Sequence, residues 1–168
     1  MSVLRLAGII RESIVDGPGL RFVVFAQGCP HHCTGCHNPE TWAFEGGFET
    51  TPQKVLEEMT KNPLLRGLTL SGGEPFCQAG ALAELAEGVR ARGQDVLTYT
   101  GYLYEELARK AQEDNGVARL LRATDVLIDG PFRLAERSLE LRFRGSRNQR
   151  AIDVAASLAR GAAVEAEL

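Results

Sequence analysis

The feature that most constrains this chain is a cluster of three cysteines, Cys29, Cys33 and Cys36, spaced C-x3-C-x2-C. Thiolates are soft ligands that select zinc, copper(I) or iron–sulfur clusters. A structural zinc site closes a tetrahedral set of four ligands, and electron-transfer clusters also use four cysteines. Three cysteines on a four-iron cluster leave one iron without a protein ligand. The spacing therefore favours a cluster with one iron open to a small molecule.

Two other uses of these thiols stay open at this point. Zinc could be bound by the three cysteines together with His31, His32, His37 or the distant Cys77. A disulfide is disfavoured, because three clustered cysteines pair badly and the N-terminus lacks the basic-then-apolar order of a secretory leader. We expect His31 and His32 to lie on the loop surface rather than to bind metal. We expect Cys77 to be a small buried apolar side chain.

Alternation of apolar runs and amphipathic segments predicts an α/β fold. Strands are predicted over 3–10 (a short edge strand), 22–26, 67–70, 95–99, 125–128 and 152–154. Helices are predicted from Thr51-Pro52 to Asn62-Pro63, and over 79–92, 104–112 and 117–122. Strand–helix alternation indicates parallel strands with right-handed crossovers, and these units are too few to close an eight-fold barrel. We therefore predict an open, partial β/α barrel. The cysteine loop follows the run 22–26, at a strand end where sites form in such sheets.

Length and composition limit the class of protein. The 168 residues predict one domain, 1–168, and the hydrophobic fraction of 44% is that of a globular chain. The net charge of −3 predicts no general attraction to nucleic acid or to anionic lipid. No apolar run is long enough to span a bilayer, so no membrane partner is expected. Free cysteines without a leader predict a cytoplasmic location.

Several motifs carry a resemblance to a known family. Cys29, Cys33 and Cys36 match the cysteine motif of the radical S-adenosylmethionine (SAM) superfamily, and the segment 71–75, Ser-Gly-Gly-Glu-Pro, resembles its GGE segment. Further segments resemble the glycyl-radical-enzyme activases, and most closely the activators of anaerobic ribonucleoside-triphosphate reductase. These are 16–21, 36–42, 99–102, 126–132 and 143–150. The likeness covers nearly the whole chain, with the motifs in the family's order.

The resemblance implies a function. A [4Fe–4S] cluster would be held by Cys29, Cys33 and Cys36, which are thereby the catalytic residues. SAM would chelate the open iron, and one-electron reduction would cleave it to a 5′-deoxyadenosyl radical. That radical would abstract hydrogen from a glycine of the partner, a glycyl radical enzyme and most simply the anaerobic ribonucleotide reductase. A one-electron donor such as flavodoxin is implied as well, and the open side of the barrel would admit the protein substrate.

The resemblance also implies contacts to SAM. Gly72, Gly73 and Glu74 would receive its amino group, and Thr100 would hydrogen-bond ligand atoms. Asp129, at the end of the strand 125–128, would lie close to the SAM site.

One position departs from the superfamily pattern. Many members carry an aromatic residue directly before the third cysteine, where it contacts the adenine, and here that residue is Gly35. We expect His37, after the third cysteine, to take over this contact.

Other functions remain as alternatives. The chain could activate another glycyl radical enzyme of the pyruvate formate-lyase type, although those activases are usually longer, or act as another radical SAM enzyme. A different class is a non-catalytic iron–sulfur electron carrier or a zinc protein. The arginine-rich stretch 133–150 is either a solvated charged face or a docking surface for the partner.

Overall fold

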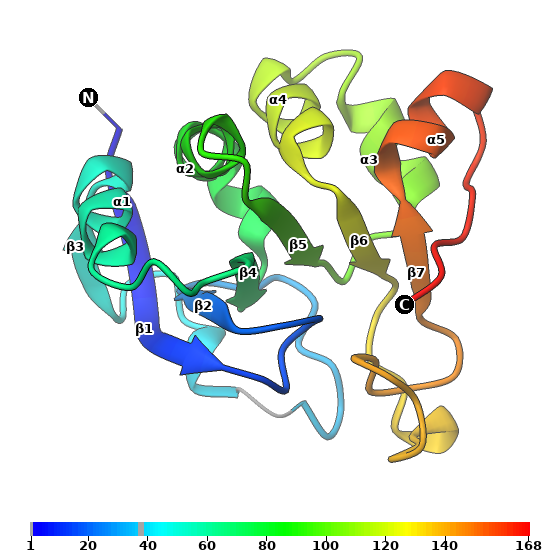
Figure 1. Ribbon diagram of the computed structural model, residues 1–168. Coiled ribbons are helices and arrows are strands. Elements are labelled where there is room, and N and C mark those ends of the chain that lie inside the picture. Colours follow the sequence, from blue (N-terminus) through cyan, green and yellow to red (C-terminus); the bar gives the residue numbers. More distant parts are fainter. Residues whose placement is uncertain (1, 37–38) are drawn as a thin grey trace.

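The computed structural model describes residues 2–36 and 39–168, and its strands form one seven-stranded sheet (Figure 1). The strand order across the sheet is β3-β1-β2-β4-β5-β6-β7. The strands are β1 (Leu4–Ser13), β2 (Arg21–Ala26), β3 (Phe48–Thr50), β4 (Gly67–Gly72), β5 (Asp95–Tyr99), β6 (Val126–Asp129) and β7 (Arg150–Asp153). Because β3 and β7 lie at opposite ends of this order, the sheet is open.

The centre of the sheet is parallel and its flanks are antiparallel. Strands β2, β4, β5 and β6 pair in parallel, whereas β1 pairs antiparallel with β2 and β3, and β7 pairs antiparallel with β6. The predicted α/β fold with parallel strands in an open sheet is confirmed. The prediction of a short edge strand over 3–10 was wrong, since β1 extends to Ser13 and lies inside the sheet. The three-residue strand β3, too short to show a periodic pattern, takes the edge instead.

Five helices cover one face of the sheet (Figure 1). They are α1 (Pro52–Thr60), α2 (Ala79–Ala91), α3 (Tyr104–Lys110), α4 (Asn115–Ala123) and α5 (Val154–Arg160), with 3-10 turns η1 (Pro39–Thr41), η2 (Pro75–Gln78) and η3 (Leu134–Glu136). Helix α1 begins as predicted, because Thr51 Oγ1 accepts a hydrogen bond from the Lys54 N–H and Pro52 fills the first turn. Each helix contributes to one apolar core with alternate residues of the strands, such as Leu68 and Leu70 of β4.

The opposite face of the sheet is covered by loops and by the C-terminal tail. Arg21 is 1% exposed; its Nε donates to Thr69 Oγ1 at 2.7 Å and its Nη1 pairs with Asp95 at 2.6 Å. Its Nη1 also donates to the Pro18 carbonyl at 3.0 Å, which holds the loop 14–20 against this face. The part of the face left uncovered lies at the carboxyl ends of the parallel strands.

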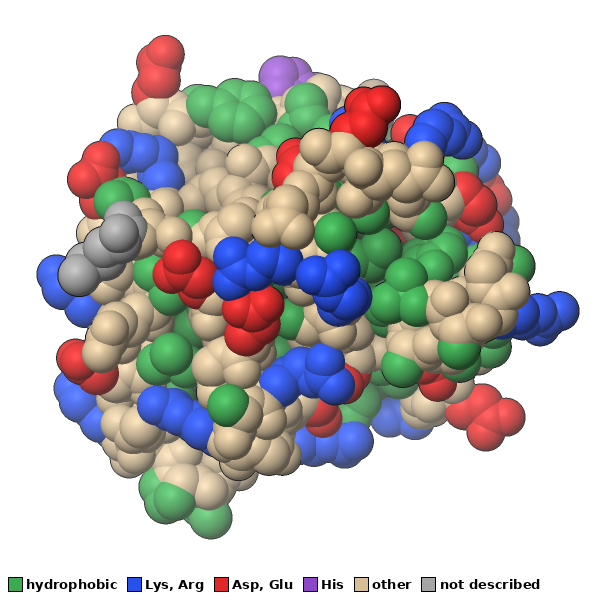
Figure 2. Space-filling view, turned by 90° about the horizontal axis from the view of Figure 1, so that it is seen from above, with side chains coloured by type: hydrophobic (Ala, Val, Ile, Leu, Met, Phe, Trp, Pro, Cys, Tyr) green, Lys and Arg blue, Asp and Glu red, His purple; other side chains and the backbone are tan. Residues whose placement is uncertain are grey.

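The face of the molecule seen from above shows no field of one charge. Acidic and basic side chains are interspersed on the face seen in Figure 2, in keeping with 19 Lys and Arg against 22 Asp and Glu. None of the helices in the described part of the chain has the length and apolarity needed to cross a bilayer.

Candidate active site at the carboxyl ends of the parallel strands

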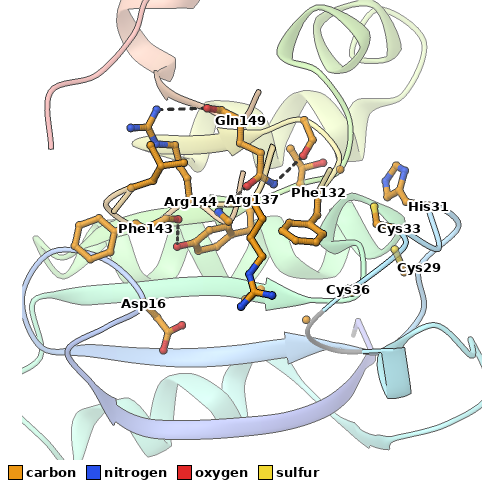
Figure 3. Close-up of a pocket in the computed structure, with 18 of the residues that line it drawn as sticks. Asp16, Cys29, His31, Cys33, Cys36, Phe132, Arg137, Phe143, Arg144 and Gln149 are labelled. Carbon is orange, nitrogen blue, oxygen red and sulfur yellow. Dashed lines mark hydrogen bonds between the residues drawn. The ribbon is translucent and has the colours of Figure 1, made fainter. Parts of the chain in front are cut away.

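A cavity of about 540 Å³ opens where the parallel strands end (Figure 3). Its volume lies in the range of small-molecule sites. The lining comes from the loop after β2, the ends of β4 and β5, and the long segment between β6 and β7. The sequence-predicted site residues in this lining are Cys29, Cys33, Cys36, Gly72, Gly73 and Thr100. Glu74 and Asp129 lie outside it, and His37 lies outside the described residues.

The cysteine loop is closed by backbone hydrogen bonds. The Cys29 N–H donates to the Trp42 carbonyl at 3.2 Å, and the Cys36 N–H donates to the Cys33 carbonyl at 3.1 Å. Gly35, with φ of +77°, allows the turn between these last two cysteines. Burial raises the pKa of the Cys29 thiol, and the nearby backbone N–H groups of His31 and His32 oppose that shift. All three thiols thus face one cavity from one loop.

The donor set fits an iron–sulfur cluster better than a single ion. Within residues 2–36 and 39–168, no three Cys, His, Asp or Glu side chains are grouped closely enough to hold one metal ion. A zinc site needs its ligands to converge on a single centre. In a four-iron cluster each thiolate binds a different iron, so the thiolates surround the cluster instead. Three soft sulfur ligands lining one cavity suit a [4Fe–4S] cluster held by Cys29, Cys33 and Cys36.

The other candidate zinc ligands in the described chain have different positions. His32 is exposed, as predicted, and stacks on Trp42 with ring centroids 4.5 Å apart. The surface prediction for His31 was wrong, since only 17% of its side chain is exposed and its Nε2 lies 2.7 Å from Glu74 Oε1. The prediction for Cys77 was also wrong: it is exposed, because the turn η2 buries Phe76 and directs the next residue outward.

Gly72 and Gly73 bring the end of β4 against the cysteine loop. A Cβ on Gly73 would lie 2.3 Å from the Gly28 carbonyl oxygen, and Gly72 has φ of +93°. The Gly73 N–H donates to the Ala26 carbonyl at 2.8 Å, and the Glu74 N–H donates to the Gly28 carbonyl at 2.7 Å. The two glycines therefore permit close backbone packing at the first cysteine while also lining the cavity.

Glu74 is fully buried and its carboxylate is occupied by protein donors. Oε1 lies 2.7 Å from His31 Nε2 and accepts from the Gly101 N–H at 2.8 Å. The Thr100 hydroxyl lies 3.0 and 2.9 Å from the two oxygens, and the Phe76 N–H donates to Oε2 at 3.1 Å. This carboxylate joins the cysteine loop to the ends of β4 and β5.

Asp129 is fully buried at the end of β6 and holds neighbouring elements together. Its Oδ2 accepts from the Tyr104 N–H at 2.8 Å, at the start of α3, and its Oδ1 accepts from Arg150 Nε at 3.0 Å. Arg150 also pairs with Glu105 at 2.7 Å and lowers the pKa of that carboxyl. Both oxygens of Asp129 are thus taken up by α3 and β7.

The residues 131–149, which we call the flap, supply cavity lining that the residue patterns did not assign to the site. The side chain of Gln149 closes its base: Nε2 donates to the Gly130 carbonyl at 3.0 Å, and Oε1 accepts from the Gly145 N–H at 2.8 Å. Asn148 Nδ2 donates to the Pro131 carbonyl at 2.8 Å. The polar run 145–149 is the signal in the sequence that could have identified this part of the lining.

The tip of the flap is fastened to the sheet by Tyr99. Its hydroxyl donates to the Phe143 carbonyl at 2.6 Å, and burial raises the Tyr99 pKa well above its ordinary value. Phe143 has φ of +61°, a left-handed conformation that is uncommon for an aromatic residue. The hydrogen bond helps to hold that conformation over the cavity.

Comparisons with known proteins agree with the cysteine motif. Residues 15–152 match the model of a family described as a 4Fe-4S single cluster domain. The anaerobic ribonucleoside-triphosphate reductase-activating protein of Vibrio cholerae is 35% identical in an alignment of length 144 that covers 81% of this chain and 89% of the relative. Proteins of the same name from Enterobacteria phage T4 and Escherichia coli K12 are 35% and 34% identical, over 81% of this chain and 85% and 90% of their own lengths.

One solved structure is also similar. QueE from Escherichia coli is 17% identical, with a TM-score of 0.47, over 59% of this chain and 52% of its own. The relatives share about a third of their residues with this chain, over most of both sequences, and this similarity identifies its family. The chain belongs to the family of anaerobic ribonucleoside-triphosphate reductase-activating proteins.

Proposed function

We propose that this chain activates an anaerobic ribonucleoside-triphosphate reductase, a glycyl radical enzyme, by reductive cleavage of SAM at a [4Fe–4S] cluster. The observation that carries the proposal is the cavity at the strand ends, with three cysteine thiols in its wall, in a chain of this family. When bound, the cluster and SAM supply the radical that takes hydrogen from the partner's glycine. The protein supplies orientation and a cavity that limits access of water.

Cys29, Cys33 and Cys36 would hold the cluster, each through its thiolate. The backbone of Gly72 and Gly73 borders the same cavity next to the cysteine loop, and we propose that its carbonyl groups receive the ammonium group of SAM. Thr100 borders it from the end of β5.

Glu74 and Asp129 are assigned a structural role rather than a contact with SAM. Because both carboxylates are buried and already hydrogen-bonded, we propose that they position the cavity walls rather than contact SAM. The contact of His37 with adenine stays a prediction. It is tested by His37→Ala, since unchanged SAM affinity would reject it.

Several expectations about the setting belong to the same proposal. The reductase is the proposed partner, with a one-electron donor of the flavodoxin type and no nucleic-acid or membrane partner. A cytoplasmic location is part of the proposal, because thiols stay reduced in that compartment. Residues 1–168 are proposed to act as one domain, because the strands described all belong to one sheet.

The test is anaerobic reconstitution with iron and sulfide, followed by SAM, dithionite and the reductase. We expect 5′-deoxyadenosine and a glycyl radical signal in electron paramagnetic resonance, and neither with Cys33→Ala. A protein that carries zinc alone, or a correctly loaded cluster that leaves SAM intact even with the reductase present, would overturn the proposal. Radical formation on a pyruvate formate-lyase but not on the reductase would reassign the partner.

A further inference from the structure

Two arginines of the flap, Arg137 and Arg144, line the cavity, and neither has a carboxylate partner in the described chain. Arg144 is turned onto the flap itself, where its Nη1 donates to the Gln149 carbonyl at 3.4 Å. Figure 3 shows the Arg137 side chain extending from the flap toward the space between Asp16 and Cys36. Among residues 2–36 and 39–168, no Asp or Glu lies within ion-pair distance of its guanidinium. Two other arginines of the stretch 133–150 are neutralised, since Arg133 pairs with Glu136 at 3.2 Å and Arg150 pairs with Asp129.

The backbone of Arg137 is held by hydrogen bonds, although its guanidinium forms no ion pair within the described chain. The Arg137 N–H donates to the Leu134 carbonyl at 3.2 Å, and the residue forms a β-bridge with the fully buried Ser146. The adjoining Arg147 N–H donates to the Glu136 carbonyl at 2.9 Å. The guanidinium is therefore delivered to the cavity from an ordered base, which lowers the cost of ordering it around a ligand.

The only acidic side chain in the cavity lining described here is that of Asp16. Its Oδ2 accepts a hydrogen bond from the Ser13 hydroxyl at 2.5 Å, and its carbonyl accepts from the Thr69 hydroxyl at 2.7 Å. Asp16 is thus held by its own loop and forms no ion pair with Arg137. An anionic acceptor supplied by a ligand would complete the cavity.

We propose that Arg137 binds the carboxylate of SAM. The inference rests on the proposed function, which places SAM in this cavity. SAM carries one anionic group, its carboxylate, whereas its ammonium and sulfonium groups are cations that a guanidinium repels. A guanidinium matches a carboxylate through two parallel N–H···O bonds, which gives orientation as well as affinity. Arg137 would thereby fix the methionyl end of SAM from the flap side, opposite the cysteine loop.

The test compares SAM with decarboxylated SAM, which keeps the adenosyl, sulfonium and amino groups. Binding to the cluster-loaded, oxidised protein is measured by anaerobic equilibrium dialysis for the wild type, Arg137→Leu and Arg147→Leu. Arg147 is the matched control, because it is an exposed arginine of the flap outside the cavity lining. Circular dichroism and iron content confirm that each variant is folded and loaded.

We expect Arg137→Leu to weaken SAM binding about 10- to 100-fold, the usual effect of losing a charge-assisted hydrogen bond, and to leave the decarboxylated analogue within about 2-fold. Arg147→Leu should change neither. Equal losses for both ligands would overturn the inference and give Arg137 a merely structural role. Unchanged SAM binding with weaker binding of the reductase would overturn it in favour of a partner contact. A loaded wild type that binds no SAM would instead refute the proposed function.

Discussion

Replacing Glu74 by alanine should destabilise the protein strongly, because this buried carboxylate serves four donors. They are His31 Nε2, the Thr100 hydroxyl and the N–H groups of Gly101 and Phe76, at 2.7 to 3.1 Å. The alanine variant leaves them without an acceptor in a site closed to solvent. The expected result is a folded state that is less stable, with the cysteine loop released from the end of β5.

The size of the destabilisation follows from the number of buried hydrogen-bond donors left without an acceptor. An unsatisfied buried donor costs about 1–3 kcal/mol, and breaking a buried charged network costs about 3–5 kcal/mol. The Thr100 hydroxyl can turn to another acceptor, and water can enter the space left by the side chain. We therefore expect Glu74→Ala to lower the free energy of unfolding by about 3–5 kcal/mol. Glu74→Gln keeps one acceptor oxygen and should cost less, about 1–3 kcal/mol.

Urea unfolding of the reduced, cluster-free protein, followed by circular dichroism, measures these differences. For a chain of this length the alanine variant should also melt roughly 10 °C lower. Glu57→Ala is the control, since Glu57 is exposed on α1, and it should stay within about 0.5 kcal/mol of the wild type. A loss below about 1 kcal/mol for Glu74→Ala would show that the network does not stabilise the fold, and the positioning role would fall with it.

Three further predictions concern the glycine pair, the distant cysteine and the flap. Gly73→Ala places a Cβ 2.3 Å from the Gly28 carbonyl oxygen, so it should lower the free energy of unfolding by about 1–3 kcal/mol and lower the iron content after reconstitution. Gly8→Ala is the control and should do neither, because a Cβ on Gly8 has nothing within 4 Å. Equal iron content in the two variants would contradict this prediction. Cys77→Ser should keep full iron content and the same cluster spectrum as the wild type, because Cys77 is exposed and outside the cavity lining, and loss of the cluster would make it a ligand. Burial raises the Tyr99 pKa above its ordinary value of 10.0, so the folded state holds the phenol proton more tightly than the unfolded chain does. The wild type should therefore lose stability as pH rises above about 10. Tyr99→Phe should lose less between about pH 9.5 and 11 in urea titrations, and parallel pH curves for the two proteins would disprove the assignment.

The parallel core and the cysteine site could be predicted because their signals are local. The apolar run ending at Ala26 leads directly into the cysteine loop, and Thr51-Pro52 marks a helix start by itself. Strand ends meet at one edge of a parallel sheet, so Cys29, Gly72 and Thr100 were expected to converge, and the cavity brings them together.

What could not be predicted depends on partners far apart in the chain. In the sequence, the Glu74 carboxylate follows two glycines and is predicted to bind a ligand. In the structure it accepts hydrogen bonds from Thr100 and Gly101, which follow a different strand. Asp129 likewise depends on Arg150. The edge strand β3 has three residues, too few to show the period-two alternation that identifies a strand.

The closed base of the flap has an evolutionary consequence. Gly130 and Gln149 are joined by a hydrogen bond, so the eighteen positions between them form a loop whose length and composition can change without moving β6 or β7. Insertions, deletions and substitutions in this stretch would alter the wall facing the ligand while the cysteine loop and the sheet keep their geometry. Divergence among such activators is therefore expected to concentrate in the positions of this loop other than Arg137, whereas Asn148 and Gln149 at its base should vary least.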